Sequence, residues 1–182
     1  MKILIIQTSP PHTASTLLVN AVYGLISELS DKKIIYSDNI DNIINTNNEN
    51  IMVIKTHDTN IDELNDKYNK EYNLLFICSE RQEKNYKIDE KYKSYKNVLI
   101  FDFDELNETT NNSLPLIVDN MYDKINNSFI ELGLDDIKLD RTKCIERIQA
   151  MNRRYEEIKH KPFSYVDDFF EIHGSHRNRL ST

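Results

Sequence analysis

The first twenty residues constrain the fold more than any other part of the chain. Lys2–Thr8 is a continuous apolar run, which is typical of a strand buried on both faces of a parallel sheet. A loop rich in hydroxyl side chains follows, and then apolar residues with helical spacing from Leu17 to Ile26. In this strand–loop–helix arrangement, backbone N–H groups and the helix dipole favour a bound anion. The loop therefore predicts a ligand that carries phosphate.

The loop lacks the residues of the two common nucleotide signatures. A nucleoside-triphosphate loop needs G-x-x-x-x-G-K-[ST], but Ala14 stands before the hydroxyl pair Ser15-Thr16 and the loop has no lysine. A dinucleotide fingerprint needs three glycines, and the loop has none. The missing lysine and glycines therefore exclude both nucleotide signatures.

Apolar runs continue along the chain and alternate with helical patterns. Strands are predicted at residues 2–8, 33–36, 51–56, 74–78 and 98–103, and helices at residues 17–29, 61–70, 86–95, 117–132 and 143–159. The polar stretches 42–50 and 107–112 are predicted to be loops. We expect one α/β domain over residues 1–182, a three-layer sandwich in which helices flank a mostly parallel, P-loop-like nucleotide-binding sheet.

Composition limits the partners and the compartment. The formal net charge of -7 argues against broad nucleic-acid binding, which needs a basic face. No apolar run reaches the roughly 20 residues that cross a bilayer, and no signal peptide is recognised. Cys78 and Cys144 form no metal or disulfide pattern, so we expect buried, reduced thiols. The expectation is a cytoplasmic protein that binds neither membrane nor nucleic acid.

Polar and ionisable residues follow each predicted strand. The second long strand ends in Lys55-Thr56-His57, the third in Ser79-Glu80-Arg81, and the fourth runs into Asp102 and Asp104. Ligands of open α/β sheets bind outside the carboxyl ends of the strands. We therefore expect these side chains to gather at one edge of the sheet.

Five segments, in order, resemble the sulfotransferase family. Residues 11–18, P-H-T-A-S-T-L-L, resemble the family loop P-[RK]-[ST]-G-[ST]-T-x-L, which holds the 5′-phosphosulfate of 3′-phosphoadenosine 5′-phosphosulfate (PAPS). Lys55-Thr56-His57 resembles the K-T-H of its cytosolic members. Residues 98–106 resemble the strand that leads to Y-E-D-L, residues 129–134 the F-L-G-L after the next helix, and residues 174–178 a late loop over the cofactor.

This resemblance implies an enzyme that moves a sulfuryl group from PAPS to a hydroxyl or amine of a small molecule or saccharide, without a metal. His57 is then the general base, a role that histidine side chains commonly fill. Lys55 and His12 are then the catalytic cations. The residues that the resemblance assigns to PAPS binding are Pro11, His12, Thr13, Ala14, Ser15, Thr16, Ser79, Arg81, Gly174, Ser175, His176 and Arg177.

The chain also departs from the family pattern. His12 replaces the loop lysine or arginine, and Ala14 replaces the loop glycine. Ser79 stands where the family has an arginine for the 3′-phosphate, and no serine follows at the expected distance. The residues that remain as candidates for that phosphate are Arg81, Lys84, Arg177 and Arg179.

Other functions stay open at this point. A non-catalytic relative would keep the fold and bind a nucleotide or a partner. A small P-loop phosphoryl-transfer enzyme is the other alternative, and the missing loop lysine argues against it. Asp102-Phe103-Asp104 is similar to the D-x-D of haloacid-dehalogenase phosphatases, but that motif usually lies near the N-terminus. His173 and His176 have no carboxylate or cysteine pattern that completes a metal site.

Overall fold

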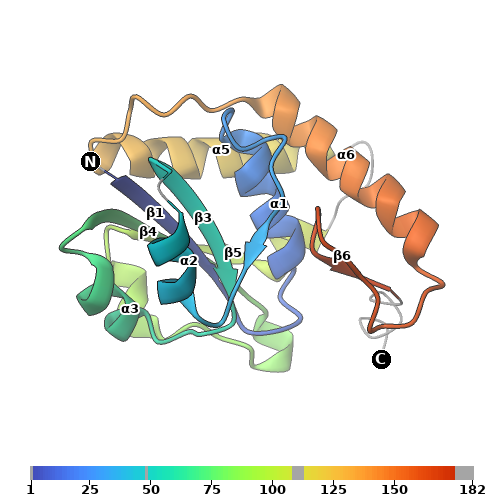
Figure 1. The fold of residues 1–182 in the computed structure, drawn as a ribbon, viewed down its shortest axis with the longest axis horizontal. Coiled ribbons are helices and arrows are strands. Elements are labelled where there is room, and N and C mark those ends of the chain that lie inside the picture. The colour runs from blue at the N-terminus through green and yellow to red at the C-terminus, as the bar shows by residue number, and fades with distance from the viewer. Residues whose placement is uncertain (1, 48, 108–112, 175–182) are drawn as a thin grey trace.

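Five parallel strands form the centre of the protein (Figure 1). In this computed structural model, which describes residues 2–47, 49–107 and 113–174, the strand order is β2-β3-β1-β4-β5. The strands are β1 (Lys2–Thr8), β2 (Ile35–Tyr36), β3 (Ile51–Thr56), β4 (Tyr72–Glu80) and β5 (Val98–Asp102). All four strand pairs are parallel, so the predicted parallel α/β sheet is confirmed.

Helices cover both faces of this sheet. They are α1 (Ser15–Leu25), α2 (Ile40–Thr46), α3 (Ile61–Tyr68), α4 (Phe103–Asn107), α5 (Leu114–Glu131) and α6 (Arg141–Ile158), with 3₁₀ turns η1 (Gln82–Lys84) and η2 (Glu90–Ser94). One face packs against α1, α5 and α6, and the other against α2, α3 and η2 (Figure 1). The predicted three-layer sandwich is therefore confirmed.

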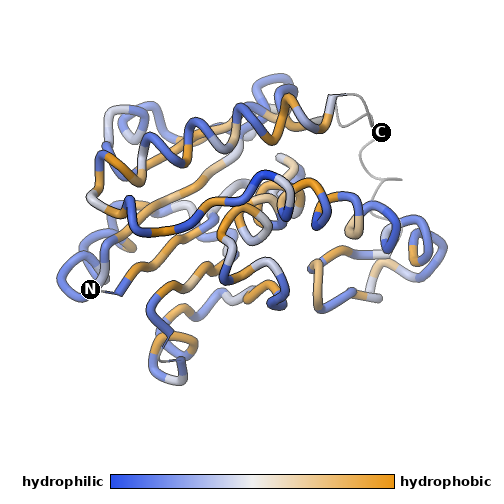
Figure 2. The backbone as a smooth tube through the Cα atoms, turned by 90° about the horizontal axis from the view of Figure 1, so that it is seen from above, coloured by the Kyte–Doolittle hydropathy of each residue, from blue (hydrophilic) through white to orange (hydrophobic). Residues whose placement is uncertain are grey.

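The alternation of side chains along β1 explains the two cores. Ile3 and Ile5 pack with α1, α5 and α6, whereas Leu4 and Ile6 pack with α2 and α3. Successive side chains of a strand point to opposite faces, so a central strand covered on both sides must be apolar at every position. Figure 2 shows this pattern as strands that are mostly orange, and helices that alternate between orange and blue.

Two local predictions were wrong. Residues 42–46, predicted as part of a loop, belong to α2, because the Asn39 side chain caps the helix by accepting from the N–H of Asn42 and because Ile40 is buried. Residues 86–95 do not form an α-helix: only η2 is helical there, and it begins at the Asp89 side chain, which accepts from the N–H of Lys91.

After α6, residues 159–174, here called the C-terminal segment, return to the sheet. They contain a small antiparallel hairpin of β6 (Val166–Asp167) and β7 (Ile172–His173), which lies beside α6 in Figure 1. The backbone N–H of Ile34, next to β2, donates to the carbonyl of Phe169 at 3.3 Å. The segment therefore joins the chain near β2 to α6.

The central position of β1 fixes where a ligand can bind. The chain leaves β1 through α1 toward β2 on one side, whereas β4 pairs with β1 on the other side. Such a reversal opens a crevice at the carboxyl end of the central strand. Residues 9–14, which join β1 to α1, lie at that crevice.

Two further sequence expectations are tested by this part of the chain. Cys78 and Cys144 are both free and buried, as predicted. Among the described residues, no helix has the length and apolar character needed to cross a membrane.

Candidate functional site

The loop between β1 and α1 has an alternating backbone. His12 has a φ of 67° and Ala14 a φ of 60°, whereas Thr13 between them and Ser15 after them do not have positive φ. Alternation between right- and left-handed residues turns successive N–H groups toward one point, which makes a concavity for an anion. Each left-handed residue that is not glycine costs about 1–2 kcal/mol. The loop adopts these two left-handed conformations despite their energetic cost.

Three buried hydroxyl groups hold the loop in this shape. The backbone N–H of Ser79 donates to Oγ of Ser9 at 2.8 Å, and the hydroxyls of Thr13 and Ser79 are 2.9 Å apart. Thr13 Oγ1 also donates to the carbonyl of Pro10 at 2.8 Å. Thr13 and Ser79 therefore lie beneath the loop and shape it, and neither lines the cavity described below.

The N-terminus of α1 is open. Leu18 donates to the carbonyl of Ala14 at 3.0 Å, and no side chain caps the helix. Within residues 2–47, 49–107 and 113–174, no acceptor pairs with the backbone N–H groups of Ser15, Thr16 and Leu17, which begin the helix. These N–H groups and the positive end of the helix dipole together form an anion-binding site.

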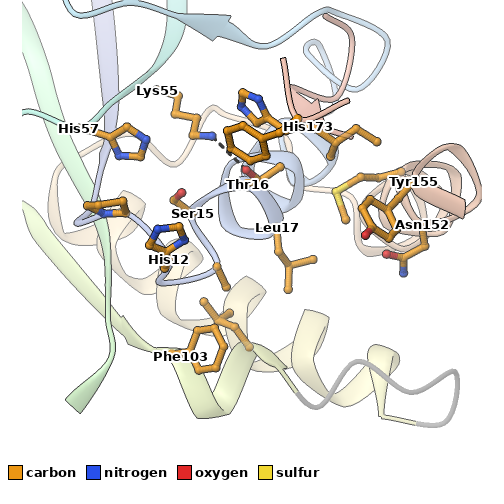
Figure 3. Close-up of a pocket in the computed structure, with 16 residues that line it drawn as sticks. His12, Ser15, Thr16, Leu17, Lys55, His57, Phe103, Asn152, Tyr155 and His173 are labelled. Atoms are coloured by element: carbon orange, nitrogen blue, oxygen red, sulfur yellow. Dashed lines mark hydrogen bonds between the residues drawn. The ribbon is translucent and has the colours of Figure 1, made fainter. Parts of the chain in front are cut away.

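A cavity of about 250 Å³ opens in front of the loop (Figure 3). His57 and His12 lie on one side of it, Asn152 and Tyr155 on the opposite side, and Phe103 lies across from His173. Its walls come from the loop, from the end of β3, from α4 and α6, and from the C-terminal segment. The lining residues are Pro11, His12, Ala14, Ser15, Thr16, Leu17, Lys55, His57, Phe103, Leu106, Met151, Asn152, Tyr155, Phe163, Ile172 and His173.

His57, directly after β3, is held in one tautomer. Its Nδ1 lies 2.9 Å from the carbonyl oxygen of Ser9. A carbonyl only accepts hydrogen bonds, so Nδ1 carries the proton and donates it. In neutral His57, Nε2 then keeps its lone pair, which is the form that a general base needs.

Lys55 lies deep in the same site. It is 2% exposed, and its Nζ donates to Oγ1 of Thr16 at 3.0 Å and forms an ion pair with Glu171. Burial lowers the pKa of Lys55 below its ordinary value, and the charge of Glu171 opposes this shift. The predicted cation is thus next to the open end of α1, but it has a carboxylate partner.

Glu171 is a site residue that sequence reasoning missed. It is 8% exposed, and its Oε1 lies 3.4 Å from Nε2 of His173. Burial raises the pKa of the Glu171 carboxyl, but His173 and Lys55 outweigh burial and hold it below its ordinary value. No motif marks Glu171, because its partner Lys55 lies 116 residues away in the sequence.

Arg81 and Gly174 lie outside the cavity lining. The guanidinium of Arg81 stacks on Phe103, 4.1 Å from the ring centroid, and its Nε and Nη1 are buried without an acceptor among the described residues. A Cβ on Gly174 would come within 2.5 Å of the carbonyls of Lys161 and Pro162, so glycine allows a close chain crossing there. Ser175, His176 and Arg177 lie outside the described residues.

The structure thus brings together half of the site residues that the sequence predicts. Pro11, His12, Ala14, Ser15, Thr16, Lys55 and His57 line one cavity. The wall from α6 was missed, because Met151, Asn152 and Tyr155 belong to no motif and follow ordinary helical spacing.

Asp102 caps α4, since its Oδ1 accepts from the N–H of Asp104 at 2.8 Å. The described residues contain no cluster of His, Cys, Asp and Glu that could hold a metal ion.

Neither models of known protein families nor curated proteins give a match to this sequence.

Proposed function

We propose that this protein is a PAPS-dependent sulfotransferase that acts on a hydroxyl or amine of a small molecule or saccharide. One observation carries the proposal. The unpaired N–H groups at the start of α1 and the Nε2 of His57, which can accept a proton, belong to the same cavity. An anion site beside a positioned base is what transfer of a charged group to a protic acceptor requires.

The loop and α1 are the proposed site of the 5′-phosphosulfate. The unpaired N–H groups of Ser15, Thr16 and Leu17 donate to its oxygens, and the hydroxyls of Ser15 and Thr16 lie at the same helix end. Lys55 adds a positive charge beside Thr16. Preorganised donors of this kind stabilise charge without reorganisation during the reaction.

Arg81 fits a second phosphate group. Its Nε and Nη1 are buried and have no acceptor among the described residues, and an unpaired buried guanidinium is costly unless a ligand anion completes it. Phe103, under the guanidinium, lines the cavity. Arg81 is therefore the candidate for the 3′-phosphate among the described residues, although it does not itself line the cavity, and the apolar wall of Leu17, Met151 and Phe163 is the candidate for the nucleoside.

PAPS supplies the sulfuryl group: the acceptor oxygen forms a bond to sulfur while the bond from sulfur to the 5′-phosphate oxygen breaks, leaving adenosine 3′,5′-bisphosphate. His57 takes the acceptor proton at Nε2, and its Nδ1–H keeps the hydrogen bond to Ser9, which orients the ring. General-base catalysis of this kind contributes about 10²–10⁴ in rate. Lys55 and the loop N–H groups stabilise the negative charge on the leaving phosphate.

One observation favours a second candidate, a relative that binds the nucleotide without catalysis. The loop has His12 where the family has a fixed cation. A phosphoryl-transfer enzyme is less well supported, because the loop has no lysine to reach a triphosphate.

Ligand binding tests the proposal. We expect calorimetry to show selective micromolar binding of adenosine 3′,5′-bisphosphate over ATP and AMP, and a matching rise in thermal stability. A preference for ATP, or no binding at all, would overturn the sulfotransferase assignment.

Replacement of His57 separates the two candidates. In an acceptor screen with PAPS, we expect His57→Ala and His57→Gln to lose about 10²–10⁴ in turnover while bisphosphate affinity stays within a few fold. Unchanged turnover in both variants would remove His57 from the base role. Tight bisphosphate binding by the wild type, with no transfer to any acceptor, would favour the non-catalytic relative.

A further inference from the structure

The C-terminal segment delivers a carboxylate to the buried end of Lys55. Glu171 pairs with Nζ of Lys55 through Oε2 and with His173 through Oε1. Lys55, Thr16 and His173 line the cavity, but Glu171 does not. The carboxylate therefore contacts the ammonium from behind, and the proposed reaction described above gives it no role.

The backbone directly before Glu171 is held by three hydrogen bonds. Arg147 Nη2 and the N–H of Ile34 both donate to the carbonyl of Phe169, each at 3.3 Å, and Asn20 Nδ2 donates to the carbonyl of Phe170 at 2.8 Å. Glu171 itself has a φ of 54°, a left-handed conformation that costs about 1–2 kcal/mol without glycine. Strain of this kind persists only where the surroundings enforce it, and it is common at functional sites.

The surroundings of Lys55 explain why a carboxylate is needed there. Thr16 brings the positive end of α1 toward the ammonium, which disfavours its charge. The Tyr36 ring from β2 lies 5.8 Å from Nζ, and the neighbour on β1 is the uncharged Gln7. His57 follows two residues later on the same chain, and His173 lies beyond Glu171. Glu171 is therefore the anion that Lys55 contacts within the described residues.

We propose that Glu171 is a positioning residue that holds the ammonium of Lys55 beside Thr16 in its charged form, so that the cavity offers a fixed cation to an anionic ligand. The role of the ligand rests on the proposed function, whereas the effect on Lys55 does not. Burial at 2% exposure would otherwise favour the neutral amine, as the lowered pKa of Lys55 already indicates.

The direct test measures the charge of Lys55 without a ligand. The titration of its side chain is followed by NMR of protein with isotope-labelled lysine, and the signal is assigned with the double variant Lys55→Met/Glu171→Leu. We expect Glu171→Gln to lower the midpoint by about one pH unit or more, because the variant keeps the shape and removes the charge. Glu171→Asp should restore most of the wild-type midpoint.

Asp168→Asn is the matched control. It removes one negative charge from an exposed position of the same segment. We expect it to leave the titration of Lys55 unchanged. An unchanged midpoint in Glu171→Gln, or an equal fall in Asp168→Asn, would overturn the proposal.

Binding gives the second readout. Between pH 7 and pH 9, we expect Glu171→Gln to lose about tenfold in affinity for adenosine 3′,5′-bisphosphate, while the wild type and Asp168→Asn stay nearly constant. A purely structural role would weaken binding equally at every pH, and tighter binding in Glu171→Gln would mean that the carboxylate competes with the ligand; either result contradicts positioning. If the wild type does not bind the bisphosphate, the proposed function fails, and the NMR titration still decides the role of Glu171.

Discussion

Two buried cations, Lys55 and Arg147, hold the C-terminal segment in different ways. Arg147 on α6 is 4% exposed and donates only to neutral oxygens: Asn20 Oδ1 and the carbonyls of Ser30, Lys32 and Phe169. Lys55 is 2% exposed and pairs with the carboxylate of Glu171. One cation is fully enclosed, whereas the other also faces a cavity.

The difference follows from the chemistry of the two groups. The guanidinium spreads its charge over a planar fork with five donors and stacks on aromatic rings, here those of Tyr23, Phe169 and Phe170. Burial lowers the pKa of Arg147 to about 10, so it stays charged at neutral pH without a carboxylate. An ammonium is a compact charge that loses its proton more readily when buried. Lys55 therefore needs Glu171, and we assign Arg147 to structure and Lys55 to the ligand.

The largest expected effect comes from Arg147. Replacement by Met leaves several buried oxygens without donors and should cost about 4 kcal/mol or more in the free energy of unfolding. Denaturant unfolding at pH 7 measures this loss. A loss below about 1 kcal/mol would mean that water or neighbouring groups replace the guanidinium, and the contrast between the two cations would disappear.

Lys55→Met should be nearly as severe, but it can be rescued. It leaves the carboxylate of Glu171 buried and unpaired, which costs about 3–5 kcal/mol. The double variant Lys55→Met/Glu171→Leu removes both charges and should recover most of that stability without recovering bisphosphate binding. If the double variant stays as unstable as the single one, packing rather than charge sets the cost.

Asn20→Ala tests the connection between the two cations. Asn20 accepts from Nε of Arg147 and donates to the carbonyl of Phe170, directly before Glu171. Its loss should cost about 1–3 kcal/mol in stability and also weaken bisphosphate binding, because the strained turn at Glu171 loses a support. Unchanged binding in a destabilised Asn20→Ala would show that the two sites are independent.

Acid pH should affect the Lys55 cluster selectively, with the smallest expected effect. His173 and Lys55 hold the pKa of Glu171 below its ordinary value despite burial. Such a group stabilises the fold above the pKa of the unfolded chain, and this contribution is lost as pH falls through the lowered folded pKa. Stability of the wild type should therefore fall more than that of Glu171→Gln below about pH 4.5. Parallel curves for the two proteins would contradict the assigned shift.

Local patterns made the sheet and half of the site predictable from the sequence. Lys2–Thr8 is buried on both faces, so its apolar run identifies β1 without further knowledge. His57 and the loop of residues 9–14 each directly follow a strand, and the carboxyl ends of parallel strands meet at one edge of the sheet, so the sequence predicts that they lie together.

The rest of the site depends on contacts between distant residues. Glu171 and Lys55 are 116 residues apart, and the cavity wall from α6 depends on how that helix crosses α1. Residues 42–46 were predicted as part of a polar loop, because the capping role of Asn39 is visible only once Ile40 has a core to enter. In the site and in α2 alike, tertiary packing overrides the structure that local sequence propensity favours.

The long sequence separations in the C-terminal segment also determine when the site forms. Asn20 contacts Phe170 over 150 residues, Arg147 contacts Asn20 over 127, and Lys55 contacts Glu171 over 116. Contacts of this length close large loops and form late in folding. On a ribosome, the β1 loop emerges long before the carboxylate that Lys55 needs. If Glu171 positions Lys55 as we propose, ligand binding arises only once the C-terminal segment has docked beside α6.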